Sequence, residues 1–415
     1  MISSNMIYTI SHPSKIIDAE ITLPFSKSLS NRALIISQLC DQKFEINNLS
    51  DSSDTQKLLY ALQNTSNTID VGDCGTAFRF LTALLAISKK TYTLKGSPRM
   101  HQRPIKILVD ALRQIGADIR YLENEGYPPL LIKGKTLIGN KVSVKANISS
   151  QYISALLLIA PSLKNGLNIT LEGNILSKPY ISMTLKMMAF FGVHADWKDN
   201  SILIKAQQYK PQPIDIESDW SSLAFLLQAM VFANKAKVSV NGLFEDSWQG
   251  DSKVLNLFED FGIKYHFENK ILQLYKDTDS ISLIKNSELN LSDYPDLAQA
   301  YSCAISGSKN SVLLRGLDNL KYKESHRLMA LNKELLKIGQ KTRFNNSEFE
   351  IISSILNPPI ESFETHNDHR MAMCLAPFGI LFDVKMKEIE VVEKSYPNFW
   401  NDMNTLGFTI SPTID

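Results

Sequence analysis

The sequence predicts an α/β protein with two domains, each built from three copies of one helix-and-strand unit. The first observation is length, because 415 residues exceed what one ordinary hydrophobic core fills. The second is a recurring, nearly uncharged helix that is rich in alanine and leucine. The third is an amphipathic helix that recurs between these and ends at a glycine. A unit that recurs along the chain indicates a repeat architecture.

Six segments begin with polar or small residues and continue as apolar runs with few charges. Helices that are apolar on most faces are buried helices. The starts of these segments lie roughly seventy to seventy-five residues apart, except that the first two are closer. The segments are residues 30–40, 75–86, 149–161, 219–233, 294–307 and 367–380.

Amphipathic helices lie between these segments, and all but the first end at a glycine followed by strand-like sequence. A glycine in this place adopts the left-handed conformation that stops a helix. The first copy, residues 54–63, lacks the glycine, and this repeat is truncated before Ile69. If the polar starts of the buried helices converge, their dipoles make a positive cleft. The stopping glycines are Gly116, Gly192, Gly262, Gly339 and Gly407.

The composition argues against nucleic acid or a membrane as a partner. Lys and Arg number 44 and Asp and Glu number 43, so the chain is nearly neutral. No apolar run approaches the length of a membrane span, and residues 1–13 lack the apolar core of a signal peptide. The four cysteines are far apart without CxxC pairing, so neither a disulfide framework nor a thiolate zinc site is expected. We expect a reduced, cytoplasmic protein.

The stretch LPFSKSLSNRAL, residues 23–34, predicts an anion site where a strand leads into a helix. Its small hydroxyl and amide residues cap the helix and leave the first N–H groups free to meet an anion. Lys27 adds a point charge and Arg32 a planar, two-pronged donor. A phosphate is the expected occupant, and an ordinary capped helix with two solvated cations is the alternative.

Further helix starts carry related chemistry. The loop GDCGT, residues 72–76, has glycines that let a ligand approach the backbone. Arg103 stands directly before a proline that would begin a helix, which also fits an anion site. The starts at 149–151 and 177–180 are rich in hydroxyl groups and suit a polyhydroxylated ligand, with plain capping as the alternative.

The second half places carboxylates beside cations. Asp296 stands at the start of an apolar segment, where a carboxylate either caps the helix or serves as a base for a substrate hydroxyl. In KESHR, Lys323 and Arg327 are four apart, on one face of the expected helix 324–338, with Glu324 beside them. A solvated run of surface charges is the alternative there.

The stretch HNDHR, residues 366–370, is the most unusual of the second half. A metal site could be built from His366, Asp368 and His369, but no third histidine or paired carboxylate supports it. A buried capping Asp368 with an anion-facing histidine and arginine is the favoured interpretation. We therefore expect no metal.

These motifs resemble the 5-enolpyruvylshikimate-3-phosphate synthase family, in the family's order and from about residue 23 to residue 400. The resemblance implies an inverse α/β barrel fold, in which six βαβαββ-type units form two domains of three units each. It places one domain at residues 21–217 and the other at 1–20 plus 218–415, with a hinge near residues 20 and 218. The stretches that carry it are LPFSKSLSNRAL, GDCGTAFRFLTALLA, GSPRMHQRPIKILVDALRQIGA, SSQYISALLLIAP, SKPYISMTLKMMAFFGV, YKESHRL and NDHRMAMC.

The resemblance also implies an activity. The enolpyruvyl group of phosphoenolpyruvate would be transferred to the 5-hydroxyl of shikimate 3-phosphate, with release of phosphate. No cofactor is implied, the partners are these two small molecules, and a monomer is expected. Two alternatives remain: a sister carboxyvinyl transferase that acts on a nucleotide sugar, and a non-catalytic binder of phosphorylated metabolites. The binder would be expected to lose a catalytic carboxylate or lysine.

The resemblance assigns site residues position by position. Asp296 and Glu324 match carboxylates proposed as base and acid, and Lys27 is a rival for proton transfer. The positions for shikimate 3-phosphate are Lys27, Ser28, Arg32, Ser149, Ser150, Gln151, Ser177, Tyr180, Asp296, Asn319 and Lys323. The positions for phosphoenolpyruvate are Lys27, Gly75, Thr76, Arg103, Gln151, Arg327, His369, Arg370 and Lys394. The sequence departs from the family at Phe25, Asp73, Cys74 and Phe80, where Gly, Asn, Ala and Pro are usual.

Overall fold

The chain divides into two compact units in the computed structural model, which describes residues 6–277, 284 and 287–413. One unit is Ser26–Ile216, and the other combines Met1–Phe25 with Glu217–Asp415. We call them the central unit and the terminal unit, because the second contains both ends of the chain. The chain passes from one unit to the other twice, after Phe25 and after Ile216. The predicted boundaries lay near residues 20 and 218.

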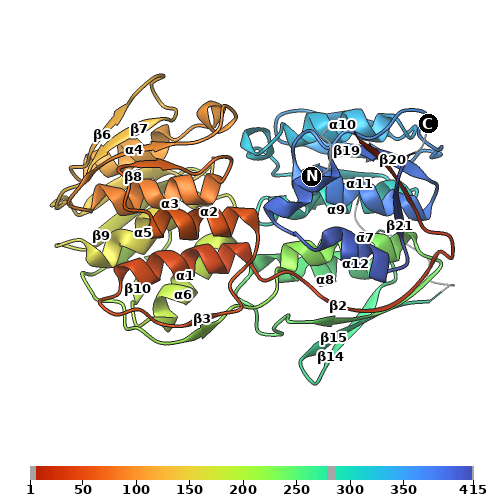
Figure 1. The fold of residues 1–415 in the computed structure, drawn as a ribbon, viewed down its shortest axis with the longest axis horizontal. Helices are drawn as coiled ribbons and strands as arrows, with labels where there is room; N and C mark the ends of the chain where they lie inside the picture. Colours follow the sequence, from red (N-terminus) through yellow and green to blue (C-terminus); the bar gives the residue numbers. More distant parts are fainter. Residues whose placement is uncertain (1–5, 278–283, 285–286, 414–415) are drawn as a thin grey trace. The chain divides into compact units, whose positions relative to one another are not determined.

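One strand order recurs in four sheets of four strands, and it defines the repeat. Figure 1 shows two neighbouring strands of one such sheet, β6 and β7, side by side. In the central unit, β4 runs parallel to β5, while β7 is antiparallel to both β5 and β6. Helix α3 connects the parallel strands and α4 leads into the hairpin, so the unit reads βαβαββ. Its elements are β4 (Thr68–Asp70), α3 (Gly75–Ala86), β5 (Thr91–Lys95), α4 (Lys106–Gln114), β6 (Asp118–Tyr121) and β7 (Leu130–Lys133).

The central unit holds two further repeats. The complete one consists of β8 (Lys141–Lys145), α5 (Ser150–Ile159), β9 (Leu167–Glu172), α6 (Lys178–Phe190), β10 (Ala195–Lys198) and β11 (Ser201–Ile204). The short one consists of α1 (Lys27–Leu39), β3 (Ile46–Asn47) and α2 (Ser53–Gln63), with β3 parallel to β12 (Ile214–Asp215). No hairpin follows α2 among the residues described there, which agrees with the predicted truncation of this first repeat.

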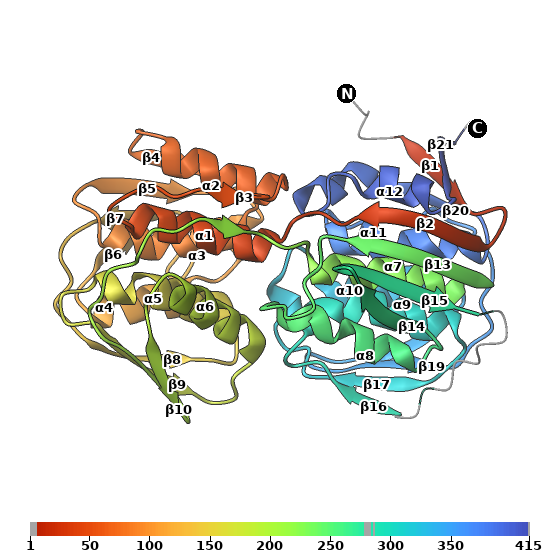
Figure 2. The ribbon, with the colours of Figure 1, turned by 90° about the horizontal axis from the view of Figure 1, so that it is seen from below.

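The terminal unit also contains three repeats, and the N-terminal segment supplies strands to two of them. The first joins β2 (Ile16–Thr22) to α7 (Trp220–Phe232), β13 (Lys235–Asn241), α8 (Val254–Glu259), β14 (Lys264–Glu268) and β15 (Ile271–Lys276). The second is β16 (Glu288–Asn290), α9 (Ala298–Gly307), β17 (Val312–Arg315), α10 (Arg327–Leu336), β18 (Lys341–Phe344) and β19 (Phe349–Ile352). The third is α11 (His369–Leu375), β20 (Val384–Lys387), α12 (Phe399–Thr405) and β21 (Thr409–Pro412), with β1 (Ile7–Ser11) between β20 and β21. Figure 2 shows β2 lying beside β13, with which it pairs in parallel.

The predicted α/β repeat fold is confirmed, down to the kind of helix in each repeat. Each of the six predicted apolar segments contains a buried helix, and every residue of α7 is buried. The five predicted stop glycines have positive φ, from +78° to +102°. Two segments are shorter helices than expected, because Pro295–Leu297 and Ala376–Ile380 form 3-10 turns that contain a proline.

Two helix starts beside predicted site residues were predicted wrongly. Helix α4 begins at Lys106, so the proline that follows Arg103 precedes the helix and does not begin it. The second error concerns α10 and matters for the site. Helix α10 begins at Arg327, and His326 caps it by accepting a hydrogen bond at Nδ1 from the N–H of Met329 (3.3 Å). Lys323 has extended backbone, with ψ −161°, so it precedes the helix together with Glu324. The prediction that Lys323 and Arg327 share a helix face was therefore wrong.

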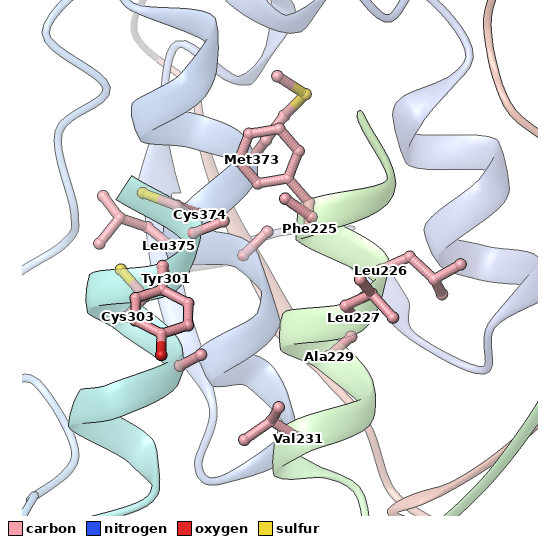
Figure 3. Close-up of a cluster of buried hydrophobic side chains, with 14 of the residues drawn as sticks. Phe225, Leu226, Leu227, Ala229, Val231, Tyr301, Cys303, Met373, Cys374 and Leu375 are labelled. Carbon is pink, nitrogen blue, oxygen red and sulfur yellow. The ribbon is translucent and has the colours of Figure 1, made fainter. Parts of the chain in front are cut away.

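The core of the terminal unit lies where its three buried helices meet. Figure 3 shows Phe225 and Leu227 of α7, Tyr301 and Cys303 of α9 and Met373 of α11 within one apolar cluster. This packing fixes the helices side by side, so the polar residues at their N-termini have defined positions. Within the described ranges, no helix combines the length and apolar character needed to cross a membrane.

Candidate functional site

The predicted site residues fall into two sets, one in each unit. The central unit carries Lys27, Ser28, Arg32, Gly75, Thr76, Arg103, Ser149, Ser150, Gln151, Ser177 and Tyr180. The terminal unit carries Asp296, Asn319, Lys323, Glu324, Arg327, His369, Arg370 and Lys394.

Arg32 in the central unit is a buried cation held by neutral oxygen atoms. From α1 it donates to the hydroxyls of Thr184 (2.7 Å) and Ser154 (3.1 Å), and to the backbone oxygen of Ser28 (2.8 Å). Its guanidinium also lies 5.5 Å from the ring centre of Phe80. Burial lowers the pKa of Arg32 to about 10, so it remains charged at neutral pH. No carboxylate among the described residues pairs with Arg32, which suits it to a carboxylate or phosphate of a ligand.

Lys27, the first residue of α1, is oriented by a carboxylate. Its Nζ lies 3.1 Å from Oδ2 of Asp54, which is buried in the first turn of α2. The thiol of Cys74 donates to the backbone oxygen of Asp54 (3.4 Å). The same sulfur accepts from the N–H of Ala77 and caps α3. These contacts bring the N-termini of α1, α2 and α3 together.

The start of α3 has room for two guanidinium groups because residue 75 is glycine. A Cβ at Gly75 would lie 2.8 Å from both terminal nitrogens of Arg103 and 2.8 Å from Nη1 of Arg79. Any side chain there would therefore displace these groups. Arg79 donates to the backbone oxygen atoms of Gly75 (3.1 Å) and Pro104 (3.2 Å), which fixes its position. Asp73 accepts a short hydrogen bond from the hydroxyl of Ser97.

The starts of α5 and α6 complete the group in the central unit. Gln151 donates from Nε2 to the hydroxyl of Thr76 (3.2 Å), which links α5 to α3. Ser149 caps α5 through the N–H of Gln151 (3.3 Å). Ser177 precedes α6 with φ +55° and ψ +40° and makes no capping bond, so plain capping is not its role. A non-glycine residue in this conformation marks a position that the surroundings hold.

Asp296 is the centre of the set in the terminal unit. Its Oδ1 lies 3.2 Å from Nζ of Lys323 and 3.0 Å from Nη1 of Arg327. Its Oδ2 lies 3.4 Å from Nη2 of Arg370, which also donates through Nη1 to the backbone oxygen of residue 296 (2.8 Å). Burial acts to raise the pKa of Asp296, but Arg370, Lys323 and Arg327 together outweigh it and hold the pKa well below its ordinary value.

Asp368 joins the helix starts of α10 and α11. It caps α11 by accepting from the N–H of Arg370 (3.0 Å), as the sequence predicted. Its Oδ2 also accepts from Nε of Arg327 (2.9 Å) and from the hydroxyl of Ser325 (3.0 Å). Arg327 in turn lies 2.9 Å from Oε2 of Glu324. Glu324 thus reaches the cluster from the loop before α10.

The pKa values of two basic groups in this cluster, Lys323 and Arg327, are shifted in opposite directions. Burial lowers the pKa of Lys323, although Asp296 acts in the opposite direction. Burial also opposes the charge on Arg327, but Asp368, Glu324 and Asp296 outweigh it and raise the pKa of Arg327. Arg327 is therefore a permanent cation that holds three carboxylates together.

The remaining predicted residues of the terminal unit lie around this cluster. Asn319 is buried, and its Oδ1 has no hydrogen-bond partner within the described part of the chain, which leaves it available to a ligand hydroxyl. His369 is buried at the start of α11, with Nδ1 3.7 Å from Asp368. Lys394 ends the 3-10 helix Ile389–Lys394, which contacts α11.

Two of the three residues considered for a metal are engaged in other contacts. His366 turns to Glu334, at 2.7 Å, whereas Asp368 binds Arg327. A different trio, Glu334, Glu364 and His366, has ligand atoms within 4.8 Å of one another. Positive charge is already present there, because Lys337 lies 2.7 Å from Glu334.

Sequence reasoning missed the groups that orient the predicted residues. Asp54, Ser154 and Thr184 are buried and hold Lys27 or Arg32, and Asp368 was expected only to cap. The signal for Asp54 was weak, because an acidic residue in a first helical turn is common. Ser154 and Thr184 stand within apolar helices, where a hydroxyl is easily taken as incidental.

Comparison with known proteins places the chain in a family. The model of the EPSP synthase (3-phosphoshikimate 1-carboxyvinyltransferase) family matches residues 11–69 and 60–403. The 3-phosphoshikimate 1-carboxyvinyltransferase of Bacteroides fragilis (strain YCH46) is 42% identical over 412 residues, which cover 98% of this chain and 99% of that protein. The enzyme of the same name from Marinomonas sp. (strain MWYL1) is 33% identical over 419 residues, covering 94% and 97%.

Solved structures agree in fold. The EPSP synthase of Acinetobacter baumannii superimposes with a TM-score of 0.77 and 20% sequence identity, covering 98% of this chain and all of that one. The recognition made from the sequence motifs is thus confirmed. With the family model and the relatives spanning nearly the whole sequence, this chain belongs to the EPSP synthase (3-phosphoshikimate 1-carboxyvinyltransferase) family.

Proposed function

We propose that this chain transfers the enolpyruvyl group of phosphoenolpyruvate to the 5-hydroxyl of shikimate 3-phosphate and releases inorganic phosphate, a step of aromatic amino-acid biosynthesis. The observation that carries the proposal is the near full-length similarity to relatives named 3-phosphoshikimate 1-carboxyvinyltransferase. The cations and carboxylates described above support it, because every charged position that the resemblance assigns is present.

The reaction is an addition followed by an elimination. The 5-oxygen of shikimate 3-phosphate forms a bond to C2 of phosphoenolpyruvate, the hydroxyl loses its proton, and C3 takes up a proton. The bond between C2 and the phosphate oxygen then breaks while C3 loses a proton, which yields the enol ether and phosphate. Both steps move protons at carbon or at the hydroxyl, so positioned acids and bases accelerate them.

In this proposal the central unit supplies mainly binding. Arg32, with its neutral surroundings, pairs with an anionic group of shikimate 3-phosphate, and Ser28, Ser149, Ser150, Gln151, Ser177 and Tyr180 contact the rest of that molecule. Gly75, Thr76, Gln151 and Arg103 contact phosphoenolpyruvate at the start of α3. Lys27, held by Asp54, reaches both substrates and is one candidate proton carrier.

The terminal unit supplies the carboxylates. Asp296 contacts the shikimate ring as the base, Glu324 is the acid, and Asn319 and Lys323 hold shikimate 3-phosphate. Arg327, His369, Arg370 and Lys394 bind phosphoenolpyruvate. An Asp whose pKa is strongly lowered is a weak base, because base strength follows pKa. Anionic substrates that engage Lys323 and Arg370 reduce this lowering, so Asp296 becomes a stronger base when both substrates are bound.

We further propose that the two units are domains that close on the substrates, with the hinge near residues 20 and 218. Positive groups occur in both units, so the charge of the ligands offsets their repulsion. Small-angle scattering that shows no compaction with both substrates bound would contradict this. We also propose a monomer that acts in the cytoplasm, for which sedimentation and cell fractionation are the tests.

The decisive experiment is a steady-state assay of phosphate release with both substrates and with each one omitted. Release that requires both supports the proposal. Binding without release indicates the non-catalytic binder, and release only when a nucleotide sugar replaces shikimate 3-phosphate indicates the sister transferase.

A further inference from the structure

Helix α10 contacts the segment 364–368 at two places. At the first residue of the helix, Arg327 donates to Asp368 at 2.9 Å. Farther along, Glu334 accepts from the N–H of Glu364 (3.0 Å) and lies 2.7 Å from Nε2 of His366. Residues seven apart share a helix face and are separated by about 10 Å along the axis. The segment is therefore attached along the buried face of α10.

The backbone between these two contacts has an unfavourable conformation. His366 and Asn367 have φ of +54° and +53°, and neither is glycine. Two consecutive residues in the left-handed region persist only where the surrounding structure holds them. The hydrogen bond between the carboxylate of Glu334 and the ring of His366 holds the first of these two residues in place.

Glu334 is suited to hold this segment because its carboxylate is completely buried and fully occupied. It receives the His366 ring, the N–H of Glu364 and, at 2.7 Å, the ammonium group of Lys337. Burial acts to raise the pKa of Glu334, but these hydrogen bonds outweigh it and lower the pKa below its ordinary value. A buried carboxylate is thus kept ionised and immobile.

The conformation at residues 366 and 367 determines where Asp368 lies. The N–H of Asp368 donates to the backbone oxygen of Thr365 (2.9 Å), which closes a turn around the two left-handed residues. The carboxylate of Asp368 holds Arg327 and also caps the N–H of Arg370. A rotation at residues 366–367 would therefore shift both arginines relative to each other.

We propose that Glu334 and His366 form a latch that positions Asp368, and through it Arg327 and Arg370, for binding phosphoenolpyruvate. The latch deepens the function proposed above and depends on it. Both residues act through others and contact neither substrate, so they are positioning residues. When the contact between Glu334 and His366 is lost, Arg327 and Arg370 remain, but their guanidinium groups are no longer positioned to bind the same anion.

The experiment compares four variants by steady-state kinetics. Glu334→Gln removes the charge, and His366→Phe keeps a ring but removes Nε2. For both we expect the KM for phosphoenolpyruvate to rise about tenfold, with kcat and the KM for shikimate 3-phosphate changed less than about twofold. The double variant should be no worse than Glu334→Gln, because both changes remove the same contact. His366→Gln places an amide donor near the position of Nε2 and should restore most of the affinity.

The matched control is Lys333→Met. Lys333 lies on the same helix and contacts the same segment, with Nζ 3.2 Å from Glu364, but its side chain is 56% exposed. Its replacement should leave both KM values unchanged. If Glu334→Gln does not fold, the pair His366→Phe and His366→Gln decides.

Three results would overturn the latch: an unchanged KM for phosphoenolpyruvate in both single variants, an equal rise in both KM values, or no rescue by His366→Gln. A wild-type protein that releases no phosphate overturns the proposed function and the latch with it. A wild type that turns over normally beside unaffected variants overturns the latch alone.

Discussion

Replacement of Asp296 by asparagine tests the chemistry and the electrostatics of the terminal unit together. Asparagine keeps the shape and can accept a hydrogen bond, but it removes the negative charge that lies 3.0–3.4 Å from Lys323, Arg327 and Arg370. These cations face three carboxylates in the wild type, counting Glu324 and Asp368. The variant therefore leaves one positive charge in excess.

The expected loss of stability follows from the partners that remain. Breaking a buried ion pair costs about 3–5 kcal/mol when the other charge is left uncompensated. Arg327 keeps Asp368 and Glu324, so we expect a smaller cost, of about 1–3 kcal/mol. Each kcal/mol lowers the Tm of a unit of this size by about 2–4 °C, which scanning calorimetry resolves.

The stability that Asp296 contributes should depend on pH, and the direction follows from its pKa shift. The pKa of Asp296 is lower in the folded protein than in the unfolded chain, because its three cations outweigh burial. Its stabilisation is therefore complete above the unfolded pKa, about 3.9, and is lost as the pH falls through the lower, folded value. The Tm gap between wild type and Asp296→Asn should be present at pH 7 and shrink below about pH 4. A gap that stays constant in acid would refute the ion-cluster reasoning.

The effect on catalysis should be larger than the effect on binding. If Asp296 accepts the proton of the substrate hydroxyl, kcat should fall by about 10²–10⁴. The affinity for shikimate 3-phosphate, measured by calorimetry, should fall far less, because the amide keeps most hydrogen bonds. Glu324→Gln is the companion variant for the acid. Near-normal turnover in both would reduce these carboxylates to a structural role and leave Lys27 as the better proton carrier.

Three further replacements test the binding geometry. Arg370→Lys keeps the charge but loses the two-pronged donor, so the KM for phosphoenolpyruvate should rise about tenfold while that for shikimate 3-phosphate changes little. Asp54→Asn removes the charge that orients Lys27, and both KM values should rise together in the phosphate-release assay, unlike those of Arg370→Lys. Phe80→Leu removes the ring next to Arg32, and calorimetry should show shikimate 3-phosphate binding weakened about two- to fivefold. An unchanged affinity would show that this ring does not contribute to ligand binding.

The repeat could be predicted from the sequence because its signals are local. Apolar helix faces and the stop glycine of each amphipathic helix are written within single segments, and φ at Gly116 and Gly407 confirms their role. The strand pairing of β1 and β2 could not be predicted from local patterns, because β1 pairs with β20 and β21 near the end of the chain and β2 pairs with β13 at residues 235–241. Strand pairing over such distances leaves no periodic pattern.

The candidate site also contains residues that local sequence signals reveal and residues that they do not. Cationic and hydroxyl residues at helix starts stand out locally, which is how Lys27 and Arg370 were found. Their partners come from distant segments: Asp54 reaches Lys27 from another helix, and Asp368 reaches Arg327 from another repeat. The start of α10 was misplaced because KESHR has no strong helix-start signal, and His is an uncommon cap. Which residues contact each substrate stays a prediction.

Arg32 in the central unit and the arginines beside Asp296 in the terminal unit are stabilised in different ways, and this difference suggests different roles in binding. Arg32 is surrounded by neutral oxygen atoms, so an anionic ligand adds a charge partner without displacing one. Arg327 and Arg370 already face carboxylates, so an anion that binds them competes with Asp296. We therefore expect an anion that binds these two arginines to gain less affinity and to shift the protonation equilibrium of Asp296. If the substrates bind as proposed, Arg32 should contribute more to substrate affinity than Arg327 and Arg370 do, and the arrival of the second anion in the terminal unit should promote proton transfer.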